Sequence, residues 1–178
     1  MKFEIDVSGY DLFHEGYTIC IASDCGIIKG YKLKQPLITS IQDNWSKGIY
    51  RYRPTIGQRG LLKVRIYSTI VHYLFRSIDK KYDEIDLVVC RDFAWHENDI
   101  KQNLTFFLEK LQGRKIKSIT FKKLSNSSNA HGYAYLMSKD KYNLLPSYIE
   151  ININDIEPFL KRTLQKKKKN VKGINTES

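Results

Sequence analysis

Cysteine is scarce in this chain. It occurs three times in 178 residues, an odd number, and no two cysteines form a Cys-x-x-Cys pair. The four histidines stand at no spacing from these cysteines that is typical of a zinc site. We therefore expect free thiols in a reducing compartment, and neither a disulfide framework nor a structural zinc, from Cys20, Cys25 and Cys90.

Long apolar segments are also missing. No run approaches the roughly 20 residues that cross a bilayer, and the opening residues 1–6 do not form the apolar core of a signal peptide. These absences predict a cytoplasmic protein without a membrane partner. The composition, 42% hydrophobic and 28% charged, is that of an ordinary globular domain with a substantial core.

Acidic residues are few. Asp and Glu number 19 against 30 Lys and Arg, which gives a formal net charge of +11, and residues 161–178 contribute +6 of it. A basic protein of this kind favours a polyanionic partner such as nucleic acid. We expect residues 165–178, with the run Lys166 to Lys169, to be a disordered basic tail that attracts phosphates without sequence specificity.

The first half of the chain predicts three strands. Phe3 and Ile5 alternate with Asp6, which places the aspartate on the opposite face of a strand and near its end. Residues 17–22 and 27–33 are predicted to be two further strands joined by a short turn, so that all three form an antiparallel meander. Residues 34–60 are predicted to be a long loop because they contain Pro36, Pro54, Gly48, Gly57 and Gly60.

The second half alternates helices and strands. Apolar residues at steps of three and four predict a helix from Leu61 to Ile78, and the apolar run 85–90 predicts a central strand that ends in Arg91-Asp92. We predict a helix over 98–111, strands over 116–124, 132–138 and 148–153, and a last helix capped by Asn154-Asp155. This order is typical of an α/β, ribonuclease-H-like fold over residues 1–164, a mixed central sheet with helices on its faces.

Asp6 and Asp92 are the candidate catalytic pair. In this fold they stand at the ends of neighbouring strands, where two carboxylates can hold two Mg²⁺ or Mn²⁺ ions roughly 3.5–4 Å apart for phosphodiester hydrolysis. Hard oxygen ligands suit these metals. The alternative is that Asp6 faces solvent and Asp92 merely terminates a strand.

Short segments of the chain resemble the PIWI domain of Argonaute proteins. Ile5-Asp6-Val7-Ser8 and Cys20-Ile21-Ala22-Ser23-Asp24 resemble its opening, and Val88-Val89-Cys90-Arg91-Asp92 resembles its second catalytic segment. The likeness continues through Tyr135-Leu136-Met137-Ser138-Lys139-Asp140 and reaches about residue 164. It implies a nucleic-acid-guided, metal-dependent endonuclease in which Asp140 is a third metal ligand, although Asp140 can equally be an ordinary loop residue.

The chain departs from the family pattern in three respects. Phe93 stands where the family usually has glycine, and the glutamate that completes the family's tetrad has no counterpart, because no glutamate occurs between Glu15 and Glu84. Only Asp43 is placed to substitute for it. The chain also begins almost at the first catalytic strand, so the resemblance implies the PIWI half of a split or truncated Argonaute, with the guide-anchoring domains on a partner protein.

Two other functions remain open. A stand-alone type II ribonuclease H is one, since residues 127–140 loosely resemble its late motif, but Asp6-Val7 replaces the Asp-Glu pair that opens those enzymes. The other is a catalytically silent nucleic-acid-binding subunit, which tolerates the missing glutamate. Lys122 and Lys123 are candidate phosphate contacts or a solvated sheet face, and His131 and Trp95 receive only a packing or surface role.

Overall fold

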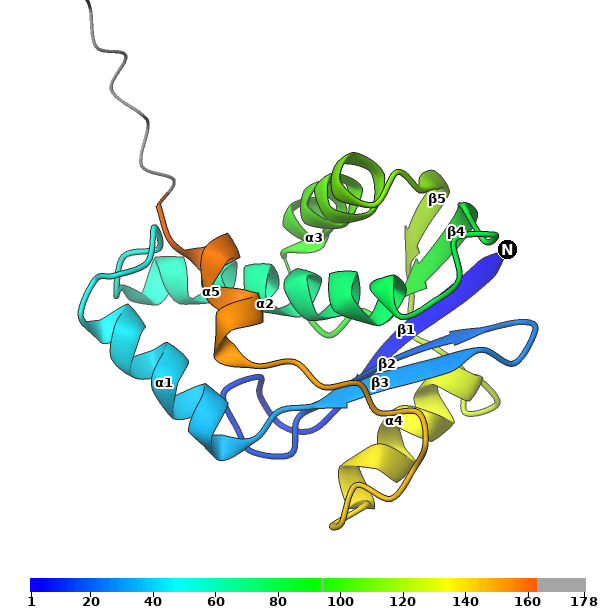
Figure 1. The fold of residues 1–178 in the computed structure, drawn as a ribbon, viewed down its shortest axis with the longest axis horizontal. Coiled ribbons are helices and arrows are strands. Elements are labelled where there is room, and N and C mark those ends of the chain that lie inside the picture. The colour runs from blue at the N-terminus through cyan, green and yellow to red at the C-terminus, as the bar shows by residue number, and fades with distance from the viewer. Residues whose placement is uncertain (94, 163–178) are drawn as a thin grey trace, which may run out of the picture.

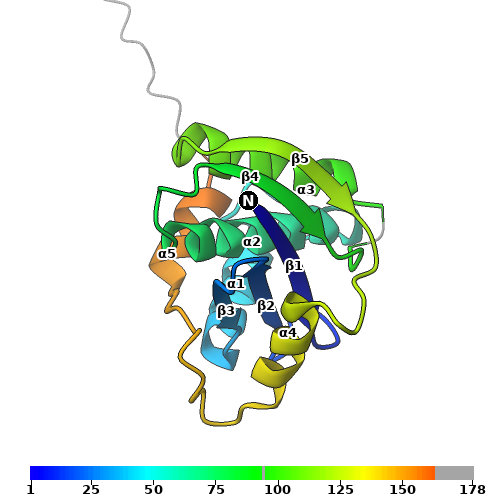
Figure 2. The ribbon, with the colours of Figure 1, turned by 90° about the vertical axis from the view of Figure 1, so that its right-hand side faces the viewer.

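A mixed sheet forms the centre of the protein. The computed structural model describes residues 1–93 and 95–162, and within them the strand order is β3-β2-β1-β4-β5 (Figure 2). The first three strands form the predicted antiparallel meander, and β4 lies parallel to both β1 and β5. The strands are β1 (Lys2–Ser8), β2 (Thr18–Ser23), β3 (Ile28–Lys32), β4 (Glu84–Val89) and β5 (Lys115–Phe121).

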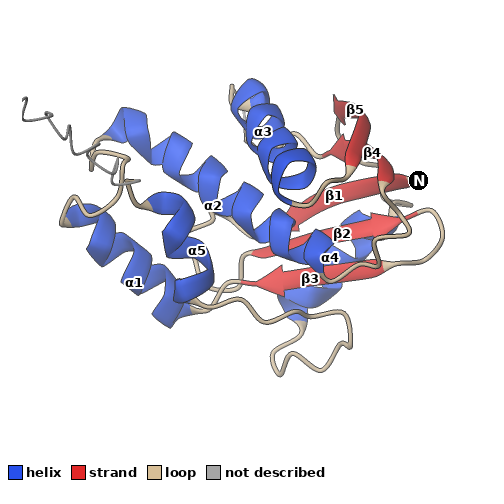
Figure 3. Ribbon diagram, turned by 45° about the horizontal axis from the view of Figure 1, so that its top comes forward, coloured by secondary structure: helices blue, strands red, loops and turns tan. Residues whose placement is uncertain are grey.

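Helices cover both faces of this sheet. One face carries α2, with α3 and its π-helical continuation η1 beside it, and the opposite face carries α4 (Figures 1 and 3). The predicted α/β class with a mixed sheet is therefore confirmed. No helix of residues 1–93 or 95–162 is both long and apolar enough to cross a membrane. The helices are α1 (Gln35–Ser46), α2 (Ile56–Arg76), α3 (Glu97–Leu104), η1 (Thr105–Leu111), α4 (Asn129–Lys139) and α5 (Ile153–Leu160).

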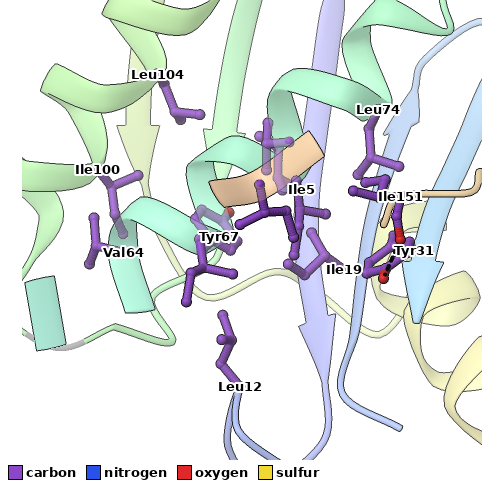
Figure 4. Packing of buried hydrophobic residues seen from close by; sticks show 14 of the residues in the cluster. Ile5, Leu12, Ile19, Tyr31, Val64, Tyr67, Leu74, Ile100, Leu104 and Ile151 are labelled. Carbon is purple, nitrogen blue, oxygen red and sulfur yellow. Dashed lines mark hydrogen bonds between the residues drawn. The ribbon is translucent and has the colours of Figure 1, made fainter. Parts of the chain in front are cut away.

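The main core lies between the sheet and α2. Alternation along β1 turns Phe3 and Ile5 to this side, where the Phe3 ring packs edge-on against Phe75 of α2 at 5.0 Å. Ile5, Tyr67 and Leu74 lie together in the same layer (Figure 4). Full burial of one such side chain contributes roughly 1.5–3 kcal/mol, so this side supplies most of the stability.

The layer between the sheet and α4 is made of small side chains. Cys20 and Ala22 on β2 contact Ala134 and Ala130 of α4. A Cβ atom added at Gly30 of β3 would lie 2.2 Å from Met137 Sδ, so glycine is needed there for the helix to sit where it does. The two surfaces approach closely for this reason, and α4 brings its polar residues down to the sheet.

Residues 132–138 are a helix and not the predicted strand. They belong to α4, whose buried face is Ala130, Ala134 and Met137, at steps of four and three. Ser128 caps the helix by accepting a hydrogen bond from His131 N at 3.3 Å. The strand prediction was wrong because alanines make a weak apolar stripe, while the two tyrosines suit a strand.

The predicted loop over 34–60 is also wrong, since it contains α1 and the start of α2. Pro36 stands in the first turn of α1, where a missing N–H leaves no hydrogen bond unmade. Residues 148–153 do not form a strand either; Tyr148 makes an isolated bridge with Gly30, and α5 begins at Ile153 behind an Asn152 capping box. The predicted basic tail over 165–178 lies outside the described residues.

Candidate metal centre

The pleat of β1 decides where Asp6 points. Because Phe3 and Ile5 face α2, Asp6 faces α4, and only 2% of its surface is exposed. On the neighbouring strand the pairing continues one residue past β4, where Cys90 N donates a hydrogen bond to Ile5 O at 2.9 Å. Asp92 N then donates to Cys90 O at 3.0 Å, a tight turn that brings Asp92 back toward β1.

These strand ends form a compact cluster of ligand atoms. Asp6, Cys90 and Asp92 each offer one atom, and the three atoms lie within 4.8 Å of one another. The structure thus brings together the two aspartates singled out from the sequence. It adds Cys90, for which only a free thiol was predicted. Alternation along β4 could have indicated its role, because Cys90 lies on the same strand face as Asp86 and Val88 and stands two residues before Asp92.

The electrostatics of the cluster favour a bound cation. Burial raises the pKa of the Cys90 thiol to about 12, and the Asp92 and Asp6 carboxylates contribute to this rise. Desolvation is the main cause that raises the pKa of Asp92; a hydrogen bond with Cys90 lowers it in part, the charge of Asp6 raises it further, and His131 lowers it slightly. The two neighbouring negative charges are stabilised when a divalent cation lies between the carboxylates.

His131 is the fourth group of the site and had no assigned role. It lies in the first turn of α4, and its Nδ1 is 2.8 Å from Asp6 Oδ2. The turn is anchored to β1 by Ser128, whose Oγ donates to Glu4 Oε2 at 2.7 Å. A helix over 129–139 would have revealed His131 beside the Ala130 stripe, so its role was hidden by the wrong strand prediction.

Asp140 is not brought together with Asp6 and Asp92. It follows α4, where its Oδ2 accepts a hydrogen bond from Leu145 N at 3.1 Å and its carbonyl accepts one from Lys32 Nζ at 2.8 Å. It stands nine positions after His131 along α4, roughly 13 Å at 1.5 Å per residue. Asp43 is exposed on α1, which packs on α5, and it does not belong to the cluster.

Lys122 and Lys123 directly follow β5, which ends at Phe121, and both are exposed. Lys122 N donates to Val89 O at 3.1 Å, so this segment runs beside the end of β4. Burial would raise the pKa of Glu4, but hydrogen bonds from Ser128 and Lys2 and the charges of Lys2 and Lys122 lower it. Lys122 therefore acts electrostatically on the same strand that carries Asp6.

The donor atoms fit a divalent cation. Carboxylate oxygens suit Mg²⁺ and Mn²⁺, whereas an imidazole or thiol beside them shifts preference toward a softer metal such as Zn²⁺. Comparison of the chain with protein-family models and with curated proteins gave no match.

Proposed function

We propose that this chain is a divalent-metal-dependent endonuclease of nucleic acids with a ribonuclease-H-like fold. The observation that carries the proposal is the cluster of Asp6, Cys90 and Asp92 ligand atoms within 4.8 Å, built on two neighbouring parallel strands. The strand order and the placement of helices on both sheet faces are compatible with that fold. The net charge of +11 suits a phosphate polymer as substrate.

The roles follow from the positions of the groups. Asp6 and Asp92 would hold Mg²⁺ or Mn²⁺, which when bound polarises a phosphoryl oxygen and activates water. His131 would fix the orientation of the Asp6 carboxylate through its Nδ1, and its ring is half-exposed. Lys122 and Lys123 would contact backbone phosphates at the rim.

The resemblance to PIWI domains extends the proposal to guided cleavage. The chain would then be the PIWI part of an Argonaute, cutting a target strand selected by a short guide. A partner protein would anchor the guide ends. Segments in support are those around Asp6 and Asp92, which are also the segments that meet in the cluster.

A catalytically silent nucleic-acid-binding subunit is the second candidate. The observation that favours it is the count of carboxylates in the cluster, which is two, with a thiol in third place. Since the pKa of Cys90 is about 12, its sulfur keeps its proton at neutral pH in the metal-free protein. A site with two carboxylates and one protonated thiol binds a cation less strongly than a full acidic tetrad.

Cleavage of a labelled target strand in Mn²⁺ tests the proposal. Wild type is compared with Asp92→Asn, with and without a complementary short guide and the proteins that co-purify from the source cell. The matched control is Asp86→Asn, which removes a carboxylate from the same face of β4 where it accepts a hydrogen bond from Ser118 Oγ at 2.6 Å. We expect cleavage to be lost in Asp92→Asn and kept in Asp86→Asn.

The dependence of cleavage on the guide and on the partner protein then separates the candidate functions. Cutting that needs both guide and partner supports the Argonaute-like function, and unaided cutting of RNA–DNA hybrids indicates ribonuclease H. Binding of nucleic acid without cutting under any condition contradicts the nuclease proposal and favours the silent subunit. An electron paramagnetic resonance titration of Mn²⁺ measures metal binding separately, and Asp92→Asn should weaken it.

A further inference from the structure

Two aromatic side chains protrude beside the metal centre. Tyr10 is 91% exposed and Trp95 is 93% exposed, among the most exposed large apolar side chains of the described residues. Tyr10 follows β1, four residues after Asp6, and Trp95 follows β4, three residues after Asp92. Because β1 and β4 are parallel neighbours, their carboxyl ends lie at one edge of the sheet, and each of the two aromatics follows one of these strands.

The fold holds Trp95 outward. Its φ is 70°, a left-handed conformation that costs a bulky residue roughly 1–2 kcal/mol. The residues around it are anchored: the Phe93 ring packs on Tyr67 at 5.0 Å, and His96 N donates to Phe93 O at 3.1 Å. His96 also fills the space above Gly60, where a Cβ would lie 2.5 Å from its Nε2.

Tyr10 stands on a similarly anchored turn. Its ring packs edge-on against His14 at 5.2 Å. Asp11, the next residue, accepts a hydrogen bond from Phe13 N at 2.9 Å and pairs with Lys63 of α2. The turn therefore presents Tyr10 from a fixed base, as the loop after β4 presents Trp95.

Flat aromatic faces beside a phosphate-processing site are suited to nucleobases. Three residues of chain span at most about 11 Å, so Trp95 lies within about three base steps of Asp92 at 3.4 Å per step. We propose that Tyr10 and Trp95 stack on unpaired bases on either side of the phosphodiester group that enters the cluster. The bases on either side of the cut are then unpaired, because inside a continuous duplex each base face is covered by its neighbours, so this inference goes with cutting or binding of a single strand and not with cleavage of a strand paired to a guide.

This inference rests on the nucleic-acid part of the proposed function, and it has its own optical readout. The chain has two tryptophans, so Trp45→Phe leaves Trp95 as the sole reporter. Trp45 lies on α1, where its Nε1 donates to Arg53 O at 3.1 Å. A 12-nucleotide single strand is added stepwise to the variant in a solution that contains Ca²⁺. A blunt duplex of the same sequence is added in a separate titration.

We expect the single strand to quench Trp95 fluorescence strongly and the duplex to quench it weakly. In a filter-binding or anisotropy assay, Trp95→Ala and Tyr10→Ala should each weaken single-strand affinity about 5- to 150-fold, the range measured for one base stacked on an aromatic ring. The matched control is Tyr142→Ala, a tyrosine 80% exposed beyond the far end of α4, which should leave affinity unchanged.

The outcomes separate this inference from the proposed nuclease function. Quenching and weakened affinity in a protein that never cuts support the stacking role and overturn the nuclease function. Cleavage by a protein whose Trp95→Ala and Tyr10→Ala variants bind the single strand as tightly as wild type overturns the stacking role alone. Failure of every oligonucleotide to bind overturns both.

Discussion

The two faces of the central sheet use burial in opposite ways. Ile5 and Asp6 are neighbours on β1, with exposed fractions of 0% and 2%. Ile5 is buried among large apolar side chains against α2, whereas Asp6 is buried under α4 beside Cys90, Asp92 and His131. Equal burial therefore stabilises the fold on one face and, on the other, gathers ionisable side chains into one cluster.

The difference has an energetic cause. Apolar burial against α2 is favourable in proportion to the area removed from water. A carboxylate buried under α4 is unfavourable unless it is paired, and Asp6 is paired only in part, through one imidazole nitrogen. If the proposed cation binds, it would stabilise the α4 face, whose full stability would then depend on a ligand as well as on the chain.

The largest expected effect comes from substituting these two neighbours separately. Ile5→Ala removes a buried side chain and should lower the free energy of unfolding by about 2–5 kcal/mol while leaving the site in the folded fraction intact. Asp6→Asn preserves shape and a hydrogen bond to His131, but it removes a metal ligand worth several kcal/mol in the transition state. Cleavage should fall about 10²- to 10⁴-fold.

Urea unfolding and Mn²⁺-dependent cleavage, measured on the same preparations, check this pair. If Asp6→Asn lowers the free energy of unfolding as much as Ile5→Ala does, the proposed difference between the two faces of the sheet is contradicted. If Ile5→Ala loses cleavage without losing stability, the site extends through the sheet to the core.

A smaller effect concerns acid stability on the α2 side. Burial lowers the pKa of His72 to about 4, below its ordinary value of 6.5. The stability that comes from this depressed pKa is present above pH 6.5 and is lost as the pH falls toward 4, at up to about 1.4 kcal/mol per pH unit. His72→Phe keeps the aromatic contacts with Phe107 and Phe159, and it should flatten this loss.

Urea unfolding at pH 7.5, 6 and 5 measures the slope of stability against pH for wild type and His72→Phe. Gln112 keeps its hydrogen bond to the backbone carbonyl of residue 72 in the variant, so any difference in slope belongs to the imidazole. Parallel slopes for the two proteins would show that His72 does not titrate with folding.

The close fit of α4 gives the next effect. In Gly30→Ala the new Cβ meets Met137 Sδ, which is buried and must move. We expect a loss of about 1–3 kcal/mol in stability, the usual cost of overpacking, together with weaker Mn²⁺ binding because α4 carries His131. Combining Gly30→Ala with Met137→Ala should recover part of the loss in a double-mutant cycle, and additive effects would contradict a direct contact.

The smallest expected effect is that of the Asp92 charge on the stability of the metal-free protein. Its folded pKa is raised, so its stabilising contribution is present below its ordinary pKa and is lost as pH rises through the raised value. Asp92→Asn should therefore increase the Tm at pH 7 by about 1–3 °C and leave it unchanged at pH 3. Added Mn²⁺ should reverse the ranking, which thermal unfolding by circular dichroism can follow.

The sequence predicted the strands of the sheet better than the helices that cover it. Alternation along β1 and the apolar run of β4 are local signals, and both placed their aspartates near the strand ends: Asp6 lies two residues before the end of β1 and Asp92 three residues after β4. The first helix was obscured by Pro36, which reads as a breaker although it suits a helix start. In α4 the apolar stripe is mostly alanine, so its period was too weak to outweigh the tyrosines beside it.

The same distinction applies to the metal centre. Asp6 and Asp92 could be paired from the order of elements, because parallel neighbours bring their carboxyl ends to one edge. His131 lies 125 residues from Asp6 in the chain, and its role depends on the docking of α4. The face of Cys90 follows from alternation with Asp86 and Val88, but its place beside Asp6 follows from the register of β4 with β1.

The place of β1 in the sheet has a consequence for biosynthesis. This strand pairs with β2 soon after it emerges, but its other neighbour, β4, arrives only with the register Lys2↔Asp86. At 5–20 residues per second, the intervening stretch takes about 4–17 s to translate. During that time β1 is an open edge, and inward-pointing charges such as Glu4 and Asp6 are a known deterrent to pairing with other chains. The carboxylate proposed for the metal would thus also protect the nascent chain from aggregation.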